Sequence, residues 1–269
     1  MVQLAPYQYS VIIGLLLSDD WLIFASKTNK NSRLGFSQSA AHGEYFWFVF
    51  FSLSHYCSSY PIVRIRSRFE QETIGLQFFT RSMPCLTELH SLFYPNGVKI
   101  IPNNIIELLI PVALAHMIME DGSVQRHGLI ICTNSYSIED VVRLMNVLII
   151  RYRLECTIHL KRQNKMEYLI YIQQGYMPSL LNIVSPYMHS SMLYKLKSAL
   201  VSNPSNRQKI KVFDLQENTT TYYNSMSEAA RALNLPSHKA ISNYITNNQV
   251  KPYKGVYTFV LKKSKLINY

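Results

Sequence analysis

The feature that most constrains the fold is an internal repeat that spans most of the chain. An apolar run ending in acidic residues occupies 12–20, and a similar run occupies 114–122. Each run is followed by the same order of predicted elements: a short strand, a helix, a basic strand, a second strand and a helix opened by a Met-Pro pair. A match of several elements in the same order indicates two copies of one structural unit.

The two copies predict matching sets of strands and helices. In the first copy we expect strands and a helix at 33–39, 44–56, 62–68 and 73–82. In the second copy we expect them at 128–135, 138–153, 156–162 and 167–173. The fixed φ of Pro84 and Pro178 suits the first turn of the helix that follows. The order predicts an α+β fold with two antiparallel sheets, each covered by helices on one face and related by a pseudo-twofold axis.

A cluster of small, polar and turn-forming residues from Ser202 to Arg207 separates this repeat from a different pattern. We therefore divide the chain into repeat 1 (1–108), repeat 2 (109–202), a linker (203–208) and a C-terminal module (209–269). In the module a strand-like run at 211–215 precedes two short helices that begin near Ser225 and Ser237. This layout predicts a helix-turn-helix, and its second helix carries the candidate groove-reading residues Lys239, Ser242 and Asn243.

The charge of the chain favours a polyanionic partner. It has 27 Lys+Arg against 16 Asp+Glu, a formal net charge of +11. The longest apolar stretches, 11–17 and 105–119, are too short or too interrupted to span a bilayer, so we expect nucleic acid and no membrane. The four cysteines show no Cys-x-x-Cys spacing, which argues against a zinc site or a disulfide framework.

Basic residues alternate along one predicted strand of each copy. Arg64, Arg66 and Arg68 would share one side of their strand. In the second copy His159 and Lys161 alternate in the same way with apolar residues. A charged strand face is ordinarily a solvated surface, but its repetition on two sheets would form a long groove for a duplex.

The acid-ended runs resemble the LAGLIDADG motif. The stretches between them are similar to organelle-intron homing endonucleases of the two-motif, single-chain kind, across about residues 8 to 200, and 209–261 resembles the helix-turn-helix module appended to some of them. The resemblance implies a duplicated αββαββα fold whose two sheets form a saddle over double-stranded DNA. It also implies a monomer encoded in an organelle, for which a mitochondrion fits better than a chloroplast. The N-terminus lacks an Arg-rich leader, which agrees with synthesis inside the organelle.

The resemblance also implies the site. Asp19 and Asp121 match the metal-binding acid of each motif, which would be catalytic and hold Mg²⁺. Gln38 and Lys165 stand where the family places residues that orient water and neutralise phosphate. Gly14 would let the two motif helices approach closely. The expected nucleic-acid contacts on sheets and module are Arg64, Arg66, Arg68, Gln77, Arg81, Thr133, Asn134, His159, Lys161, Arg162, Lys239, Ser242 and Asn243.

Three departures from the family pattern leave two functions open. Asp20 replaces the glycine after the first acid, Glu120 adds a carboxylate beside the second, and 70–72 is acidic where relatives commonly carry lysine. The first hypothesis is a site-specific DNA endonuclease that promotes intron mobility. The second is an RNA-binding protein with weak or no cleavage, either a group I intron maturase or a partner of structured organellar RNA such as rRNA. Phosphate contacts dominate both kinds of binding, so the basic strands fit either hypothesis.

Overall fold

A computed structural model describes residues 3–68, 71–162, 166–196 and 209–262. The chain divides into two compact units, 1–202 and 203–269, and each is described by itself. Lys165, one of the predicted catalytic residues, lies outside the described residues.

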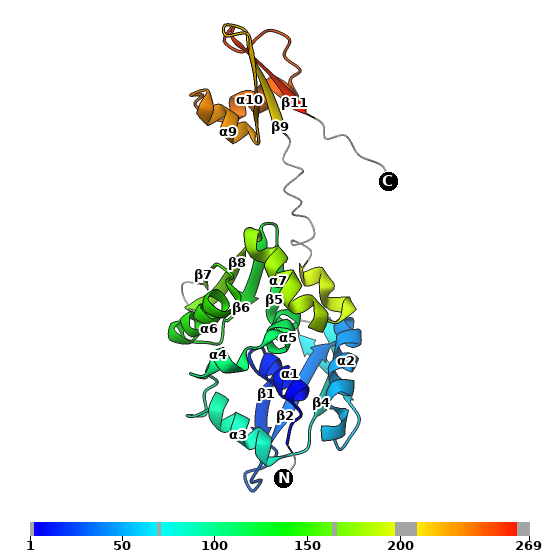
Figure 1. The fold of residues 1–269 in the computed structure, drawn as a ribbon. Coiled ribbons are helices and arrows are strands. Elements are labelled where there is room, and N and C mark those ends of the chain that lie inside the picture. Colours follow the sequence, from blue (N-terminus) through cyan, green and yellow to red (C-terminus); the bar gives the residue numbers. More distant parts are fainter. Residues whose placement is uncertain (1–2, 69–70, 163–165, 197–208, 263–269) are drawn as a thin grey trace. The chain divides into compact units, whose positions relative to one another are not determined.

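Two helices lie side by side at the centre of the first unit, α1 (Pro6–Leu16) and α5 (Pro111–Asp121) (Figure 1). Each begins with proline in its first turn. The second part of α1, residues 10–16, and most of α5, residues 112–119, are buried because these segments are mostly apolar. Their contact is very close at Gly14. A Cβ there would lie 2.5 Å from the carbonyl oxygen of Ala113 and 2.6 Å from Cβ of His116. Only glycine fits this crossing without displacing the helices.

Two four-stranded antiparallel sheets flank these helices. The first consists of β1 (Trp21–Phe24), β2 (Ser32–Ser39), β3 (Ile62–Arg68) and β4 (Gln71–Phe79), in the order β1-β2-β4-β3. The second consists of β5 (Gly122–Gln125), β6 (Gly128–Cys132), β7 (Cys156–Arg162) and β8 (Glu167–Gln173), in the order β5-β6-β8-β7. The identical order confirms the predicted duplication and the α+β class. The residue pattern did not predict the four-residue strands β1 and β5, because each directly follows a motif and is too short to show a period, although the αββαββα order implied by the resemblance includes them.

Helices cover one face of each sheet. In the first half α2 (Gly43–Leu53) packs on β2 and β4, and α3 (Pro84–Phe93) packs on β1 and β2. In the second half α6 (Ile138–Tyr152) packs on β7 and β8, and α7 (Met177–Val184) packs on α5. The remaining helical segments are α4 (Ile105–Leu108), η1 (Ala40–His42), η2 (Ser54–Tyr56), η4 (Gln174–Tyr176), η5 (Ser185–Tyr187) and η6 (Ser190–Leu196).

The strand register gives each sheet an apolar and a polar face. Leu34, Phe36 and Phe78 face the helices, and the ring of Phe36 lies 5.5 Å from that of Phe46 and 5.4 Å from that of Phe78. Alternate positions carry Arg64 in the first sheet and His159 in the second, on the face away from the core. The polar faces are the ones that sequence analysis expects to meet nucleic acid.

The second unit is a three-stranded sheet with two helices. Its strands β9 (Lys209–Asp214), β10 (Thr219–Tyr223) and β11 (Tyr257–Lys262) lie in the order β10-β9-β11. The helices are α9 (Met226–Ala232) and α10 (Lys239–Thr246). Ser225 caps α9 by accepting a hydrogen bond from the Glu228 amide at 3.1 Å. The two helices follow the predicted helix-turn-helix layout, whereas β10 was not predicted, because its threonine run lacks apolar alternation.

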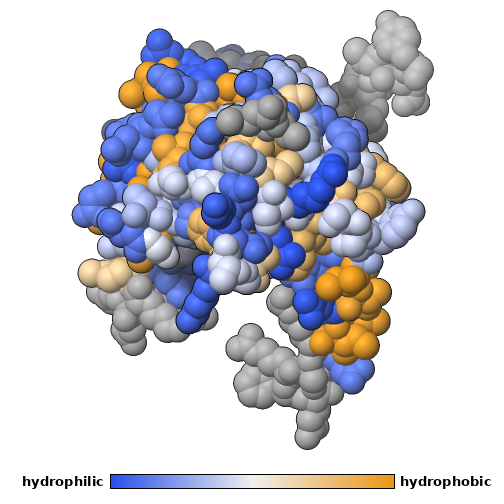
Figure 2. All heavy atoms as spheres, turned by 90° about the horizontal axis from the view of Figure 1, so that it is seen from below, coloured by the Kyte–Doolittle hydropathy of each residue, from blue (hydrophilic) through white to orange (hydrophobic). Residues whose placement is uncertain are grey.

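Apolar side chains also remain at the surface. On the face seen from below, hydrophobic residues gather in separate groups between hydrophilic ones (Figure 2). No helix in the described part of the chain is long and apolar enough to cross a membrane.

Candidate active site and nucleic-acid interface

The two motif acids lie in one shared environment at the ends of the central helices. Asp19 is exposed in the turn that follows α1, and Asp121 is the last residue of α5. Burial raises the pKa of Asp121 to about 7, and the negative charge of Asp19 contributes to the increase. The hydroxyl of Ser18 and two lysine ammonium groups oppose it. The two carboxylates, far apart in sequence, therefore act on each other electrostatically.

Two lysines hold the acidic turns from opposite halves of the unit. Lys99, beyond α3, donates from Nζ to the carbonyl oxygens of Ser18 and Asp20, the latter at 2.7 Å. Lys195, in η6, donates from Nζ to the carbonyl oxygen of Glu120 at 2.7 Å. Burial lowers the pKa of Lys99 to about 8 and also lowers the pKa of Lys195, although the nearby acids oppose both shifts.

Sequence analysis missed both lysines. Each follows the Met-Pro helix of its own repeat, Lys99 after α3 and Lys195 after α7. Comparing the two repeats beyond those helices would have identified the pair, since a lysine at a matching place in each copy is the signal. The ammonium group of one lysine therefore contacts the backbone of each acidic turn.

A second pair of carboxylates lies behind the motif acids. Asp20 is only 2% exposed, and burial raises its pKa well above the usual value, with a further contribution from the charge of Glu120. Burial raises the pKa of Glu120 to about 8, against the opposing charge of Lys195. Asp20 Oδ2 and Glu120 Oε1 are buried and have no hydrogen-bond partner among the described residues. The protein accommodates four neighbouring acids because burial keeps some of them protonated near neutral pH.

Gln38 reaches this centre from the end of β2. Its Nε2 donates to Oε2 of Glu120 at 2.8 Å, and its Oε1 accepts from the amide of Ser39 at 2.9 Å. Oε1 also lies 3.4 Å from Nδ1 of His42. Both ends of the amide are therefore engaged, which fixes the side chain of this predicted catalytic residue against the acidic end of α5.

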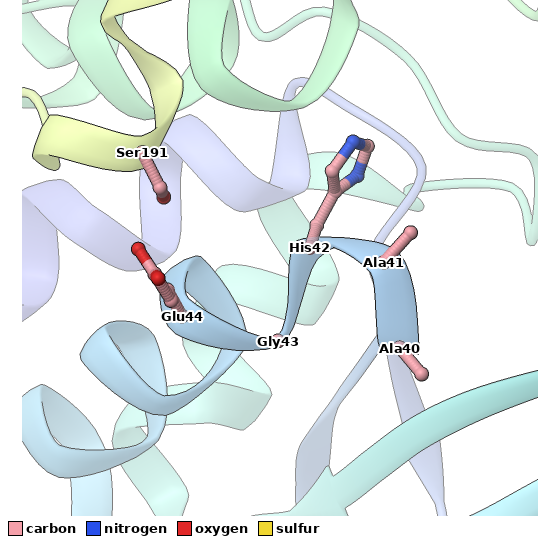
Figure 3. Close-up of a pocket in the computed structure, with 6 residues that line it drawn as sticks. All are labelled: Ala40, Ala41, His42, Gly43, Glu44 and Ser191. Carbon is pink, nitrogen blue, oxygen red and sulfur yellow. The ribbon is translucent and has the colours of Figure 1, made fainter.

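A pocket of about 440 Å³ opens beside Gln38. It lies where η1 and the start of α2 face η6, and the side chains of Glu44 and Ser191 point toward each other across it (Figure 3). His42 belongs to its lining, and the hydroxyl of Tyr194 lies 3.4 Å from Nε2 of His42. His42 therefore belongs to the pocket lining and also lies next to Gln38, which contacts Glu120.

His116 stands in the second motif where the first has Gly14. Its Nδ1 lies 3.0 Å from the hydroxyl of Tyr45, and its ring is parallel to that of Phe48 at 6.0 Å. Burial lowers the pKa of His116 to about 3, so the imidazole is neutral. It fills the space between the helices and α2 as a core residue.

Several predicted nucleic-acid contacts are exposed on the polar faces. Arg64 is exposed, and its Nε donates to Oε1 of Gln77 at 2.7 Å. His159 is exposed and lies 5.2 Å from the ring of Tyr171. The others at the surface are Asn134, Lys161, Lys239 and Asn243, with Ser242 half-buried on α10. The side chains of Arg66, Arg68 and Arg162 lie outside the described part of the structure.

Of the remaining predicted contacts, Gln77 is buried, with 6% of its surface exposed, where it accepts the hydrogen bond from Arg64. Thr133 and Arg81 are also engaged within the protein, although Arg81 stays exposed. Thr133 is buried, and its hydroxyl donates to the carbonyl oxygen of Tyr168 at 2.7 Å. The guanidinium of Arg81 donates to the carbonyl oxygen of His55. Both side chains tie a loop to the scaffold.

The first unit is thus a duplicated α+β unit with two-fold pseudosymmetry, whose two central helices end in acids. The profile of the LAGLIDADG DNA endonuclease family matches residues 9–180, and that of the NUMOD1 domain matches residues 209–245. The chain belongs to the LAGLIDADG DNA endonuclease family.

Similar proteins include both maturases and endonucleases. The cytochrome b mRNA maturase bI2 of Debaryomyces hansenii is 33% identical over 63% of this chain and 66% of its own length. The intron-encoded endonuclease ai4 of Dictyostelium discoideum is 32% identical over 55% of this chain and 97% of its own length. The similarity to the bI2 maturase of Saccharomyces cerevisiae spans only 47% of that protein.

A solved structure supports the same fold. The homing endonuclease I-WcaI, bound to its DNA recognition sequence, superimposes with a TM-score of 0.67 and 25% identity. The match covers 73% of this chain and 88% of that protein.

Proposed function

We propose that this chain is a site-specific, divalent-metal-dependent endonuclease that cuts double-stranded DNA. The observation that carries the proposal is the shared environment of Asp19 and Asp121, because two interacting carboxylates at the ends of paired helices suit a cation between them. The similarity to a homing endonuclease bound to its DNA recognition sequence supports the choice of substrate.

The donor set fits a hard cation such as Mg²⁺. Carboxylate oxygens are its preferred protein ligands, and Asp19 and Asp121 would supply one from each half. Among the described residues no three or more His, Cys, Asp or Glu side chains converge to hold a metal ion. Phosphate oxygens of the DNA and water would therefore complete the coordination. Such an ion supplies an activated water and stabilises the negative charge that develops at phosphorus.

The chain's own residues prepare the centre for that chemistry. Lys99 and Lys195 fix the acidic turns through backbone carbonyls and place positive charge where a phosphate would arrive. Gln38, held by Glu120, would orient water beside the scissile bond. Lys165, which lies outside the described residues, would assist by neutralising phosphate.

Recognition would use the polar sheet faces and α10. Arg64, Asn134, His159 and Lys161 are exposed on the first unit, and Lys239 and Asn243 are exposed on the second. We assign the phosphate contacts to the basic members and base-edge contacts to the amides. The cytochrome b maturases among the relatives support an organelle-encoded, mitochondrial protein. One chain carries both halves of the centre, so a monomer suffices.

A second function, RNA binding as an intron maturase, is favoured by a specific observation. Two relatives are named as maturases of cytochrome b mRNA, and the extra acids Asp20 and Glu120 are buried beside the motif acids, where they depart from the family pattern. The same polar faces would then hold structured RNA.

Cleavage of a plasmid library of organellar sequences in Mg²⁺ tests the first function. We expect site-specific double-strand breaks from the parent chain and none from Asp19→Asn or Asp121→Asn, because each substitution removes a charged ligand. Glu139→Gln, at an exposed acid of α6, should cleave normally. Tight binding without any cut by the parent would contradict the nuclease and favour the maturase.

A further inference from the structure

The sheet of the second unit has one face that α9 and α10 do not cover. Both helices pack against the same side of β9, β10 and β11, where Ile210, Val212 and Phe259 are buried (Figure 1). Successive side chains of a strand point to opposite faces. The intervening residues therefore lie on the other face, over which the described residues of this unit place no helix.

That face, which we call the open face, carries two cross-strand rows of side chains. The rows consist of Thr220, Phe213 and Thr258, and of Tyr222, Lys211 and Val260. All six side chains lie outside the core cluster of the unit. Tyr222 and Val260 are 52% and 55% exposed, Lys211 is exposed, and Phe213 is half-buried. The open face thus presents two aromatic rings, a lysine, a valine and two threonine hydroxyls.

The placement of these groups suits unpaired bases. Phe213 and Tyr222 are diagonal neighbours on adjacent strands, a separation of about 7–8 Å between backbones. Aromatic rings on an open sheet stack on successive bases of single-stranded RNA, because every base offers a flat face. Lys211 would contact phosphate, and the hydroxyls of Thr220 and Thr258 beside Phe213 could bond to a ribose 2′-OH.

Other occupants fit the open face less well. A duplex hides the faces of its bases within the stack, so two exposed rings would gain little from it, whereas α10 carries the polar residues suited to a groove. A protein partner would have to supply both a carboxylate for Lys211 and flat groups for the two rings, since none of the six side chains is acidic. Positive charge with aromatic rings complements a polyanion with exposed bases.

We infer that the open face of the second unit binds single-stranded RNA, with Phe213 and Tyr222 as stacking platforms and Lys211 as a phosphate contact. This site is separate from α10 and does not depend on cleavage by the first unit. It gives the chain a means of holding an unpaired RNA segment while its other surfaces hold a duplex.

Fluorescence anisotropy of the full chain with a labelled 12-nucleotide RNA of mixed sequence tests the inference. Saturating unlabelled duplex DNA is added to occupy the basic faces of the first unit. We expect Phe213→Leu and Tyr222→Ala each to weaken RNA binding about tenfold, while Tyr222→Phe retains it because the ring remains. Tyr60→Ala removes a more exposed tyrosine from the first unit and should change nothing.

Further experiments distinguish single-stranded RNA from other ligands of the open face. The RNA carrying 4-thiouridine should crosslink to β9 or β10. Unchanged RNA affinity in the Phe213→Leu, Tyr222→Ala double variant would overturn the inference, and so would tighter binding of the matching single-stranded DNA by the parent or a loss for duplex DNA in the variant. If the double variant does not fold, Lys211→Glu alone must weaken RNA binding about tenfold. Absence of DNA cleavage by the parent would concern the first unit only and would leave these binding results unaffected.

Discussion

The two halves of the first unit share one topology but differ at the point where their acids meet. The first half places Asp19 in an exposed turn and buries Asp20 behind it, whereas the second half holds Asp121 half-buried at a helix end with Glu120 beside it. The first central helix has Gly14 where the second has His116. Duplication of a backbone therefore does not impose identical chemistry, because each half buries its acids to a different extent.

The largest expected effect is on stability and concerns the close contact between α1 and α5 at Gly14. Gly14→Val would drive a side chain into the backbone of Ala113, which a flexible neighbour cannot relieve. We expect a loss of at least about 3 kcal/mol in the free energy of unfolding, measured by denaturant titration of the first unit. Gly175→Ala is the matched control, since nothing lies within 4 Å of its new Cβ. A stable Gly14→Val protein would show that the two halves can separate.

Substitution of Lys99 and of Lys195 tests whether each half of the first unit cleaves its own strand of the DNA. Lys99→Met and Lys195→Met should each slow cleavage about 10- to 100-fold, because each removes a cation from one acidic turn. We expect nicked intermediates cut on opposite strands, resolved on denaturing gels with each strand labelled. Lys27→Met, at an exposed loop lysine, is the control. Equal slowing of both strands by either variant would mean that the halves act as one centre.

The raised pKa of Asp121 predicts a pH-dependent stability. Its pKa is about 7 in the folded protein against a usual 3.8, so the folded state binds the proton more tightly. This contribution to stability is complete below pH 4 and is lost as the pH rises to about 7. In metal-free buffer at pH 8, Asp121→Asn should therefore raise the Tm by a few degrees, and the gain should disappear at pH 4.

Calorimetry across this pH range, with and without Mg²⁺, is the measurement. Mg²⁺ should raise the Tm of the parent at pH 8 more than that of Asp121→Asn, because the variant has lost a charged ligand. A Tm difference that stays constant between pH 4 and pH 8 would contradict the assignment.

The smallest expected effects distinguish Thr133, which is buried, from its exposed neighbour Asn134. Thr133→Val removes the hydrogen bond to the carbonyl of Tyr168 and should cost about 1 kcal/mol of stability. Asn134→Ala should leave stability unchanged and weaken DNA binding by about fivefold, measured by anisotropy. If Thr133→Val weakened DNA binding while stability stayed constant, Thr133 would contact DNA directly.

Sequence patterns predicted the longer elements and the repeat because burial periodicity and turn residues act locally. The helices at α2 and α6 and the strands at β3 and β7 were expected within a few residues of their bounds. The residue pattern alone missed the short strands β1 and β5, since they owe their conformation to pairing with β2 and β6. The roles of Lys99 and Lys195 were also missed, because a lysine carries no local signal of the carbonyl groups that it will reach.

The sequence by itself determined the duplication, the two acid-ended helices, the positive charge and the separate C-terminal module, since each depends on residue order and composition alone. Only the tertiary structure decided that Glu120 holds Gln38, that Lys99 and Lys195 secure the acidic turns, and that Thr133 is buried. These outcomes depend on which side chains the packed halves bring together. Packing across a helix crossing follows shape and burial in three dimensions, which no local period encodes.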